Sequence, residues 1–225
     1  GRPRRRCRST ATRFGGRLSA RTIKLGLTGS IGMGKSEAAR MFGRLGVPVF
    51  DSDATVHQLL GPGGRAVDAV AAAFPGVAKN GAVDRAALGA AVFGRPADLR
   101  RLEGILHPMV RAARARFLRQ ARARRERLVV FDVPLLFETG GERDCDAVVV
   151  VTAPPFVQRA RVLGRPGMSP EKFAAILGQQ VPDVEKRRRA DFIAPTGMGR
   201  RVTLNAIRQA ITMLCNEPKD EPCPN

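Results

Sequence analysis

Tryptophan and tyrosine are absent from the 225-residue chain, which leaves 11 phenylalanines as its source of large aromatic rings. Proteins that bind single-stranded nucleic acids use exposed aromatic rings as platforms for stacked bases. Most of the phenylalanines here fall at apolar positions of periodic segments, where we expect them to be buried. The sequence therefore disfavours nucleic-acid binding, and we expect no nucleic-acid partner.

Histidine and cysteine are scarce as well. The 2 histidines, His57 and His107, are too few for a histidine-built metal centre, and the spacing of the 4 cysteines matches neither a disulfide framework nor a zinc site. We expect reduced thiols and a cytoplasmic protein. A metal in such a chain would be one that prefers oxygen ligands, such as Mg²⁺.

Long apolar runs are also missing. No run approaches the roughly 20 residues needed to cross a bilayer, and the N-terminal segment lacks the apolar core of a secretory signal. Apolar residues still make up 44% of the chain, as in soluble globular proteins. We expect one folding unit that is a monomer, with weak self-association as the alternative, and that has no membrane partner.

Acidic residues are few relative to basic ones, and the net charge is +19. Nine basic residues lie between Arg2 and Lys24 with no acid among them, which leaves +10 for the rest of the chain. Eight arginines between Arg111 and Arg127 belong to one predicted helical region. A basic enzyme that acts on polyanions is one explanation, because positive clefts concentrate anionic ligands. A nucleic-acid-binding module that uses these two segments is the alternative.

Four short apolar runs predict strands: IKLGLT from residue 23, VPVFD at 47–51, LVVFD at 128–132 and AVVVVT at 147–152. Such continuous apolar runs are typical of parallel strands that are buried on both faces. Helical patterns lie between them, so we expect an α/β fold with a doubly wound parallel sheet flanked by helices.

Two helical regions are predicted outside the strands. Apolar residues recur at three- and four-residue steps through 97–127, where Pro108 predicts two helices or one kinked helix. A last helix carries Leu204, Ile207, Ile211 and Leu214 on one face.

A glycine-rich segment follows the first strand and precedes a helix. It fits the phosphate-binding pattern G-x-x-x-x-G-K-[ST], whose backbone N–H groups and helix N-terminus attract phosphate oxygens. Lys35 would bridge the β- and γ-phosphates of a nucleotide, and the Ser36 hydroxyl would bind Mg²⁺. The predicted nucleotide-binding residues are Gly29, Ser30, Ile31, Gly32, Met33, Gly34, Lys35, Ser36 and Glu37.

Carboxylates follow two of the predicted strands. Asp51 and Asp53 end the second strand at the sheet edge where α/β folds bind ligands. Asp53 is the candidate general base that accepts a proton from an attacking hydroxyl, and Asp51 is the more structural of the two. Both could instead cap the following helix. Asp132, at the end of the third strand, could hold Mg²⁺ through water or could be a turn residue.

Arg161 and Arg165 follow the fourth strand at a spacing of four, which predicts that both project from one helix face. Guanidinium groups suit a transferring phosphoryl group because they bind its oxygens in a fixed fork. The flanking glycines and proline suggest a mobile lid. A solvated basic face is the simpler alternative.

The chain resembles the dephospho-CoA kinase family. The matching pieces are, in order, LGLTGSIGMGKS, VFDSD, GAVDRAALGAAVF, LEGILHP, DVPLLFE, QRARVLGR and QQVPDVEKRRRAD, which together span residues 24 to about 197. One difference lies at residues 194–197, where APTG replaces an Asp-Asn-x-Gly segment associated with the adenine. A second is Glu37, which stands where the family commonly has Thr.

The resemblance implies transfer of the γ-phosphate of ATP to the ribose 3′-hydroxyl of dephospho-CoA, with Mg²⁺, as the final step of coenzyme A biosynthesis. It assigns Asp53 as base, Lys35 and Ser36 to the nucleotide, and Arg161 and Arg165 to a lid clamp. The acceptor-side candidates are Arg85, His107 and Arg111, although His107 before Pro108 could simply cap a helix.

The implied organisation has a kinase domain at 22–216 with a P-loop NTPase-type core. A helical CoA-binding region occupies about 55–125, and a lid occupies about 155–190. Residues 1–21 predict a disordered basic extension, which is either a transit or anion-docking segment or a spectator, and residues 217–225 predict a disordered tail.

Another small-molecule kinase, of nucleoside or shikimate type, is the rival enzyme. A GTPase is less compatible with the sequence, because no N-K-x-D segment that would recognise guanine is present.

Overall fold

A computed structural model of the protein describes residues 21–215. The two predicted disordered ends lie outside these residues, apart from Arg21. The guanidinium of Arg21 lies 3.0 Å from a carboxylate oxygen of Asp146.

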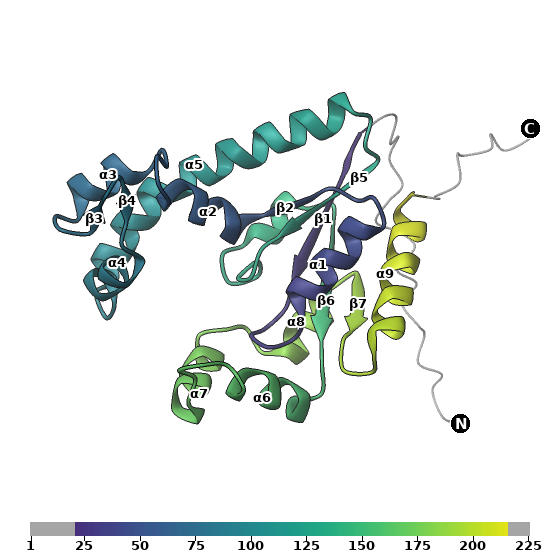
Figure 1. Ribbon diagram of the computed structural model, residues 1–225. Coiled ribbons are helices and arrows are strands. Elements are labelled where there is room, and N and C mark those ends of the chain that lie inside the picture. The colour runs from purple at the N-terminus through teal and green to yellow at the C-terminus, as the bar shows by residue number, and fades with distance from the viewer. Residues whose placement is uncertain (1–20, 216–225) are drawn as a thin grey trace, which may run out of the picture.

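The centre of the fold is a five-stranded sheet in the order β2-β5-β1-β6-β7, and all its neighbouring pairs are parallel (Figure 1). The strands are β1 Ile23–Thr28, β2 Val49–Asp51, β5 Leu128–Asp132, β6 Ala147–Thr152 and β7 Phe192–Pro195. Every residue of β5 is buried, as the continuous apolar run predicts. The predicted class, a parallel sheet flanked by helices, is confirmed.

The edge strand β7 was not predicted. It has four residues and ends at Pro195, which pairs with Thr152 of β6. A strand this short lacks a readable alternation, and proline is tolerated because an edge strand has no neighbour on its outer side. Segment 194–197, expected near the adenine, is therefore partly a continuation of the sheet.

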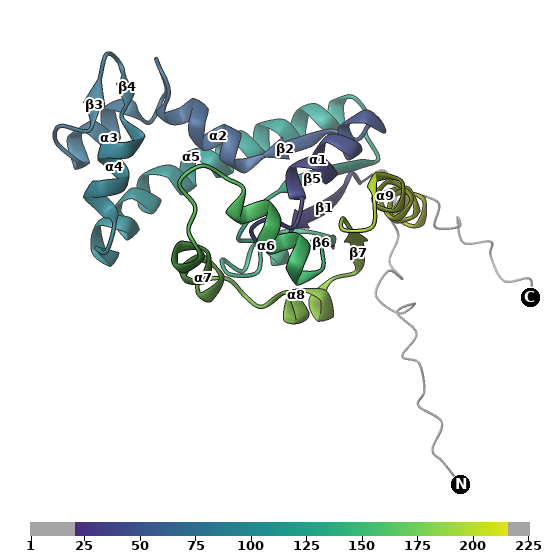
Figure 2. The same cartoon turned by 60° about the horizontal axis from the view of Figure 1, so that its bottom comes forward.

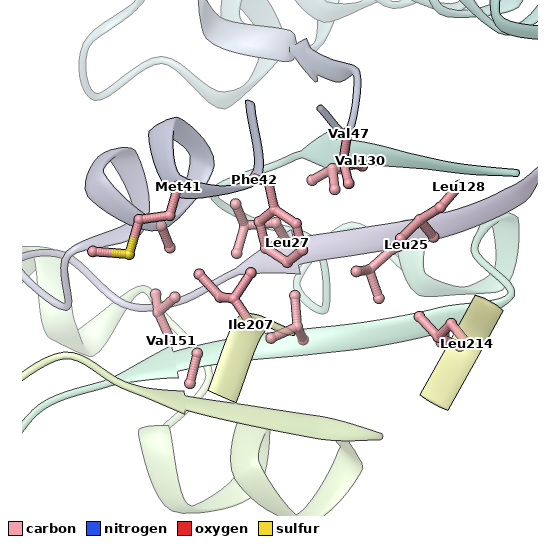
Figure 3. Packing of buried hydrophobic residues seen from close by; sticks show 14 of the residues in the cluster. Leu25, Leu27, Met41, Phe42, Val47, Leu128, Val130, Val151, Ile207 and Leu214 are labelled. Atoms are coloured by element: carbon pink, nitrogen blue, oxygen red, sulfur yellow. The ribbon is translucent and has the colours of Figure 1, made fainter. Parts of the chain in front are cut away.

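One face of the sheet packs against α1 (Lys35–Arg44) and α9 (Arg200–Cys215). Leu25 and Leu27 of β1, Phe42 of α1 and Ile207 of α9 are fully buried in this cluster (Figure 3). Burying each such side chain contributes roughly 1.5–3 kcal/mol. This packing fixes the N-terminus of α1, and with it the loop that precedes α1.

The opposite face packs mainly against the second half of α5 (Pro96–Ala123), through Phe50, Phe117 and Phe131. The rings of Phe50 and Phe131 meet edge to face with centroids 6.3 Å apart. Such aromatic pairs contribute about 0.5–1.5 kcal/mol beyond the area that they bury. This cluster holds the ends of β2 and β5 together, where the acidic residues lie.

The chain between β2 and β5 forms an insertion with its own apolar cluster, which includes Val70, Phe74 and Leu106. It projects from the sheet on the side away from α9 (Figures 1 and 2). Its elements are α2 Ser52–Leu60, α3 Val67–Ala73, β3 Ala78–Lys79, β4 Ala82–Val83, α4 Arg85–Val92 and the first half of α5. The β3–β4 hairpin was not predicted, although its Asn80-Gly81 turn, with positive φ at both residues, is a known hairpin signal.

Helix α5 is one continuous helix that contains Pro108, so the alternative of two separate helices is wrong. Pro108 cannot donate to the carbonyl of Gly104, and one hydrogen bond is lost. Packing on both sides of the proline keeps the helix whole, because Leu102 and Leu106 join the insertion cluster and Ala121 joins the sheet cluster.

Between β6 and β7 the chain forms α6 Pro155–Leu163, α7 Pro170–Gly178 and α8 Asp183–Arg189. A short 3-10 helix, η2 Gly141–Asp144, follows β5. Among residues 21–215, no helix has both the length and the apolar character that a membrane crossing requires.

Candidate active site

The glycine-rich loop joins β1 to α1 and is shaped by three glycines. Gly32 and Gly34 have φ values of +77° and +90°, which residues with a Cβ atom rarely adopt. A Cβ atom at Gly29 would lie 2.8 Å from the carbonyl oxygen of Val151 on the neighbouring strand. The loop therefore depends on glycine for its conformation and for its close approach to β6.

The loop presents a row of backbone donors at the start of α1. The N–H groups of Gly32, Gly34, Lys35 and Ser36 make no hydrogen bond to another residue within the described part of the chain. The first turn of a helix leaves its N–H groups free and carries a partial positive charge. This arrangement can bind the oxygens of a polyphosphate.

The loop lysine pairs with the carboxylate that ends β5. Lys35 Nζ lies 2.6 Å from Asp132 Oδ1, and Asp132 is only 3% exposed. Burial raises the pKa of Asp132 above its ordinary value; the charge of Lys35 opposes this rise, and the negative charges of Asp51 and Asp53 add to it. The positive charge of Lys35 thus favours the ionised form of a carboxylate that burial disfavours.

Three carboxylates meet in an open pocket of about 700 Å³ beside α1. Its lining residues are Lys35, Ser36, Ala39, Arg40, Gly43, Gly46, Val47, Pro48, Val49, Asp51, Asp53, Arg124 and Asp132. Strand register brings two of these carboxylates side by side, because Asp51 of β2 pairs with Asp132 of β5. The part of the pocket that Asp51 and Asp132 line lies at the carboxyl ends of β2 and β5, the usual ligand site of this fold class.

The two carboxylates after β2 differ in their contacts. Asp51 is the N-cap of α2 and accepts a hydrogen bond from the N–H of Ala54 at 2.9 Å. Asp53 lies in the first turn of α2, is exposed, and makes no side-chain bond within residues 21–215. Asp53 is therefore the freer of the two to contact a ligand.

The donor set of the pocket fits Mg²⁺. Ser36 supplies a hydroxyl and Asp132 a carboxylate, both from the oxygen class that Mg²⁺ prefers. The described residues contain no group of three or more His, Cys, Asp or Glu that could hold a metal ion. A Mg²⁺ ion typically keeps several waters and shares phosphate oxygens, so one or two protein ligands suffice.

Comparison with known proteins agrees with this geometry. Residues 23–197 match the family model described as Dephospho-CoA kinase. The chain belongs to the dephospho-CoA kinase family. Dephospho-CoA kinase of Rhodospirillum rubrum is 58% identical over 190 residues, which cover 84% of this chain and 90% of that protein. The protein of the same name from Paramagnetospirillum magneticum is 64% identical over 163 residues, covering 72% and 77%.

Solved structures extend the likeness to the fold. The crystal structure of TT1252 from Thermus thermophilus superposes with a TM-score of 0.74 at 34% identity and covers 86% of this chain and 97% of its own. Dephospho-CoA kinase from Campylobacter jejuni superposes with a TM-score of 0.59 at 22% identity, covering 87% and 98%.

The two candidate clamp arginines of this family member do not share a helix face. Helix α6 ends at Leu163, because Gly164 and the restriction that Pro166 places on Arg165 disfavour another helical turn. Arg165 is exposed in the loop beyond α6. Arg161 instead reaches back to the sheet, where its guanidinium donates to the backbone oxygen of Thr196 at 2.7 Å and to its hydroxyl at 3.1 Å.

Several residues that contact the loop were not predicted. Thr196 donates its hydroxyl to the carbonyl of Met33 at 2.5 Å. Gln158 and Gln180 both bond to the backbone of Ile31. Both glutamines lie in the family-matching pieces QRARVLGR and QQVPDVEKRRRAD, which were the available signal, but a contact between residues so far apart in sequence cannot be inferred from either piece alone.

The remaining candidates are not part of the pocket lining. Arg85, His107 and Arg111 are exposed on α4 and α5 and do not line the pocket. His107 is inside α5, so the alternative that it caps a helix is wrong. Glu37 contacts Arg40 at 3.0 Å and Arg200 at 2.7 Å.

Arg124 also lines the pocket, although the sequence predicts it only as one of the eight arginines of a basic helical region. It immediately follows α5, as the C-cap residue. It adds a cation to the lining of the pocket.

Proposed function

We propose that the chain catalyses transfer of the γ-phosphate of ATP to the ribose 3′-hydroxyl of dephospho-CoA, which gives CoA and ADP, the final step of coenzyme A biosynthesis. The observation that carries the proposal is that Lys35 and Ser36, at the end of the phosphate-binding loop, line one pocket with the carboxylates of Asp51, Asp53 and Asp132, in a chain that belongs to the dephospho-CoA kinase family. Such a transfer depends mostly on positioning and charge stabilisation, with a base to accept the hydroxyl proton.

The nucleotide half of the site binds phosphates. The N–H groups at the start of α1 donate to the phosphate oxygens of ATP, and Lys35 shares its charge between Asp132 and the β- and γ-phosphates. Ser36 and Asp132 would hold Mg²⁺, which supplies neutralising charge between the phosphates when bound. The apolar packing of Met33 and of α1 on the sheet keeps these donors in place before the reaction begins.

The acceptor half supplies a base. The ribose oxygen forms a bond to the γ-phosphorus while the bond from that phosphorus to the β,γ-bridging oxygen breaks, and the hydroxyl proton passes to the carboxylate of Asp53. Asp51 is less suited to this role because one of its oxygens caps α2. A positioned general base accelerates such a step by about 100- to 10,000-fold.

Cationic groups around the pocket compensate charge. Arg165 is free to turn toward the transferring phosphoryl group, whereas Arg161 would first have to leave Thr196. The exposed cations Arg85 and Arg111, with His107, mark the insertion as the binding region for the anionic acceptor. The free thiols Cys145 and Cys215 suit a reducing compartment such as the cytoplasm.

The test is an ADP-release assay with MgATP and dephospho-CoA, in which the mass of the product identifies CoA. Lys35→Ala removes a cation that faces the phosphates, and we expect kcat to fall about 100- to 1,000-fold. Arg208→Ala, which removes an exposed cation of α9, is the matched control and leaves kcat within about twofold.

Two results would contradict the proposed function. A chain that binds ATP, leaves dephospho-CoA unchanged and phosphorylates another alcohol would be a different small-molecule kinase. Salt-sensitive binding of duplex DNA by residues 21–215 would instead favour the nucleic-acid alternative.

A further inference from the structure

One residue of the phosphate-binding loop is held by side chains from both ends of the α6–α7 segment. Gln158 of α6 donates from Nε2 to the carbonyl oxygen of Ile31 at 2.8 Å. Gln180, which follows α7, accepts from the N–H of Ile31 through Oε1 at 3.0 Å. Gln158 is only 7% exposed. Its side-chain amide is therefore buried, and water competes little for its hydrogen bond.

The bond from Gln158 acts on the next residue as well. The carbonyl of Ile31 and the N–H of Gly32 belong to one planar trans peptide, in which the two groups point in opposite directions. A donor that fixes the Ile31 oxygen on the α6 side therefore turns the Gly32 N–H toward the opposite side. That N–H is one of the loop donors without a partner among the described residues.

Gly32 by itself would not hold this orientation. Its φ of +77° is open to glycine together with other regions of backbone space, so the peptide before it can rotate at little cost. Helix α6 packs closely on the same residue, since a Cβ atom at Gly32 would lie 2.5 Å from Val162 Cγ2 and 3.1 Å from the carbonyl of Gln158. The orientation of this peptide therefore depends on α6.

The backbone next to Gln180 is held in place by buried polar contacts. Oε1 of Glu138 accepts from the N–H of Val181 at 2.9 Å and lies 2.8 Å from Nζ of Lys186, a side chain with no exposed surface. Asp183 accepts from the hydroxyl of Thr152 at 2.8 Å. Residues around 180–186 are thus fixed to the loop after β5 and to the end of β6, and Gln180 is presented to Ile31 from a rigid support.

We infer that Gln158, assisted by Gln180, is a positioning residue that aims the Gly32 N–H at the β- and γ-phosphates of the nucleotide. The inference rests on the proposed function, since it assumes a nucleoside polyphosphate in the loop. It assigns a role to α6 in building the phosphate site, separate from any clamp formed by Arg161 or Arg165.

The experiment compares Gln158→Met with the wild-type chain by calorimetric titration of MgADP and of AMP, without an acceptor. Methionine keeps the length of the side chain and removes the donor. We expect the affinity for MgADP to fall about tenfold, equivalent to about 1.4 kcal/mol, while the affinity for AMP, which lacks the β-phosphate, stays within twofold. Gln179→Met, at an exposed glutamine beside Gln180, is the control and leaves both affinities unchanged.

Two results would overturn the inference: MgADP affinity within twofold of wild type, or equal weakening of MgADP and AMP, as expected of a merely structural role. If Gln158→Met does not fold, the same two titrations are made with Gln180→Met, at a half-buried position. We then expect the affinity for MgADP to fall about three- to fivefold, and the same two results would overturn the inference. These titrations contain no acceptor. They therefore test the role of Gln158 even if the chain does not transfer phosphate to dephospho-CoA.

Discussion

The ion pair between Glu138 and Lys186 should contribute strongly to stability. Lys186 is fully buried and Glu138 nearly so, and removal of one partner from such a pair leaves a buried charge at a cost of about 3–5 kcal/mol. Glu138→Gln is the cleaner single change, because an amide oxygen can still accept from the N–H of Val181. For a domain of this size each kcal/mol shifts Tm by about 2–4 °C, so we expect a drop of roughly 6–20 °C in a thermal melt followed by circular dichroism.

The stability that Glu138→Gln loses should depend on pH. Burial alone would raise the pKa of Glu138, but hydrogen bonds from Lys186 and from backbone N–H groups, including that of Val181, outweigh it and hold the pKa below the ordinary 4.5. A carboxyl with a lowered folded pKa contributes its full stability above pH 4.5 and loses it as the pH falls through the folded value. The stability difference between wild type and Glu138→Gln should therefore shrink below about pH 4.5.

A double variant separates the pair from its surroundings. Glu138→Gln combined with Lys186→Met replaces the charges with a neutral amide and an apolar chain, and we expect the free energy of unfolding to return to within about 1–2 kcal/mol of wild type. Glu185→Gln, at an exposed position of the same helix, is the control and changes little. Single variants within 1 kcal/mol of wild type, or losses that add in the double variant, would refute the reasoning.

Two further predictions concern Asp53 and Cys145. Asp53→Asn should lower kcat about 100- to 10,000-fold while MgADP affinity, measured by titration, stays within twofold; unchanged turnover would remove Asp53 as base. Burial raises the pKa of Cys145 to about 11, so only about one thiol in 1,000 is ionised at pH 8. Alkylation of Cys145 by iodoacetamide, followed by peptide mass spectrometry, should stay slow until the pH approaches 10, and rapid labelling at pH 8 would contradict its burial.

The nucleotide half of the site could be predicted because its chemistry is local in sequence. The loop from Gly29 to Ser36 follows a strand and begins a helix, and both neighbours are recognisable from their apolar patterns. The strand-end positions of Asp51 and Asp132 likewise follow from where each apolar run stops. Parallel strands then bring these ends to one edge of the sheet, as the shared pocket shows.

The parts that were missed depend on contacts between distant segments. Strand β7 gains its hydrogen bonds from β6, about 40 residues earlier, so its four residues carry little signal of their own. The prediction that Arg165 shares a helix face with Arg161 is wrong, because four-residue spacing assumes a continuing helix, whereas Gly164 and Pro166 end it. The contact of Gln158 with Ile31 spans 127 positions and becomes visible only once α6 is packed on the loop.

The pairing of Lys35 with Asp132 links the phosphate-binding loop to the carboxylate at the end of β5. A buried carboxylate whose pKa is raised by burial needs the charge of Lys35 to remain ionised. Phosphates that enter the loop compete for that same ammonium, and their negative charge raises the cost of an ionised Asp132 further. Binding of the polyphosphate therefore creates a need for additional positive charge beside Asp132, which a divalent cation held by Asp132 and Ser36 would meet. Under the proposed function, the geometry that pairs Lys35 with Asp132 would thus favour binding of the nucleotide together with a metal over binding of the bare polyphosphate.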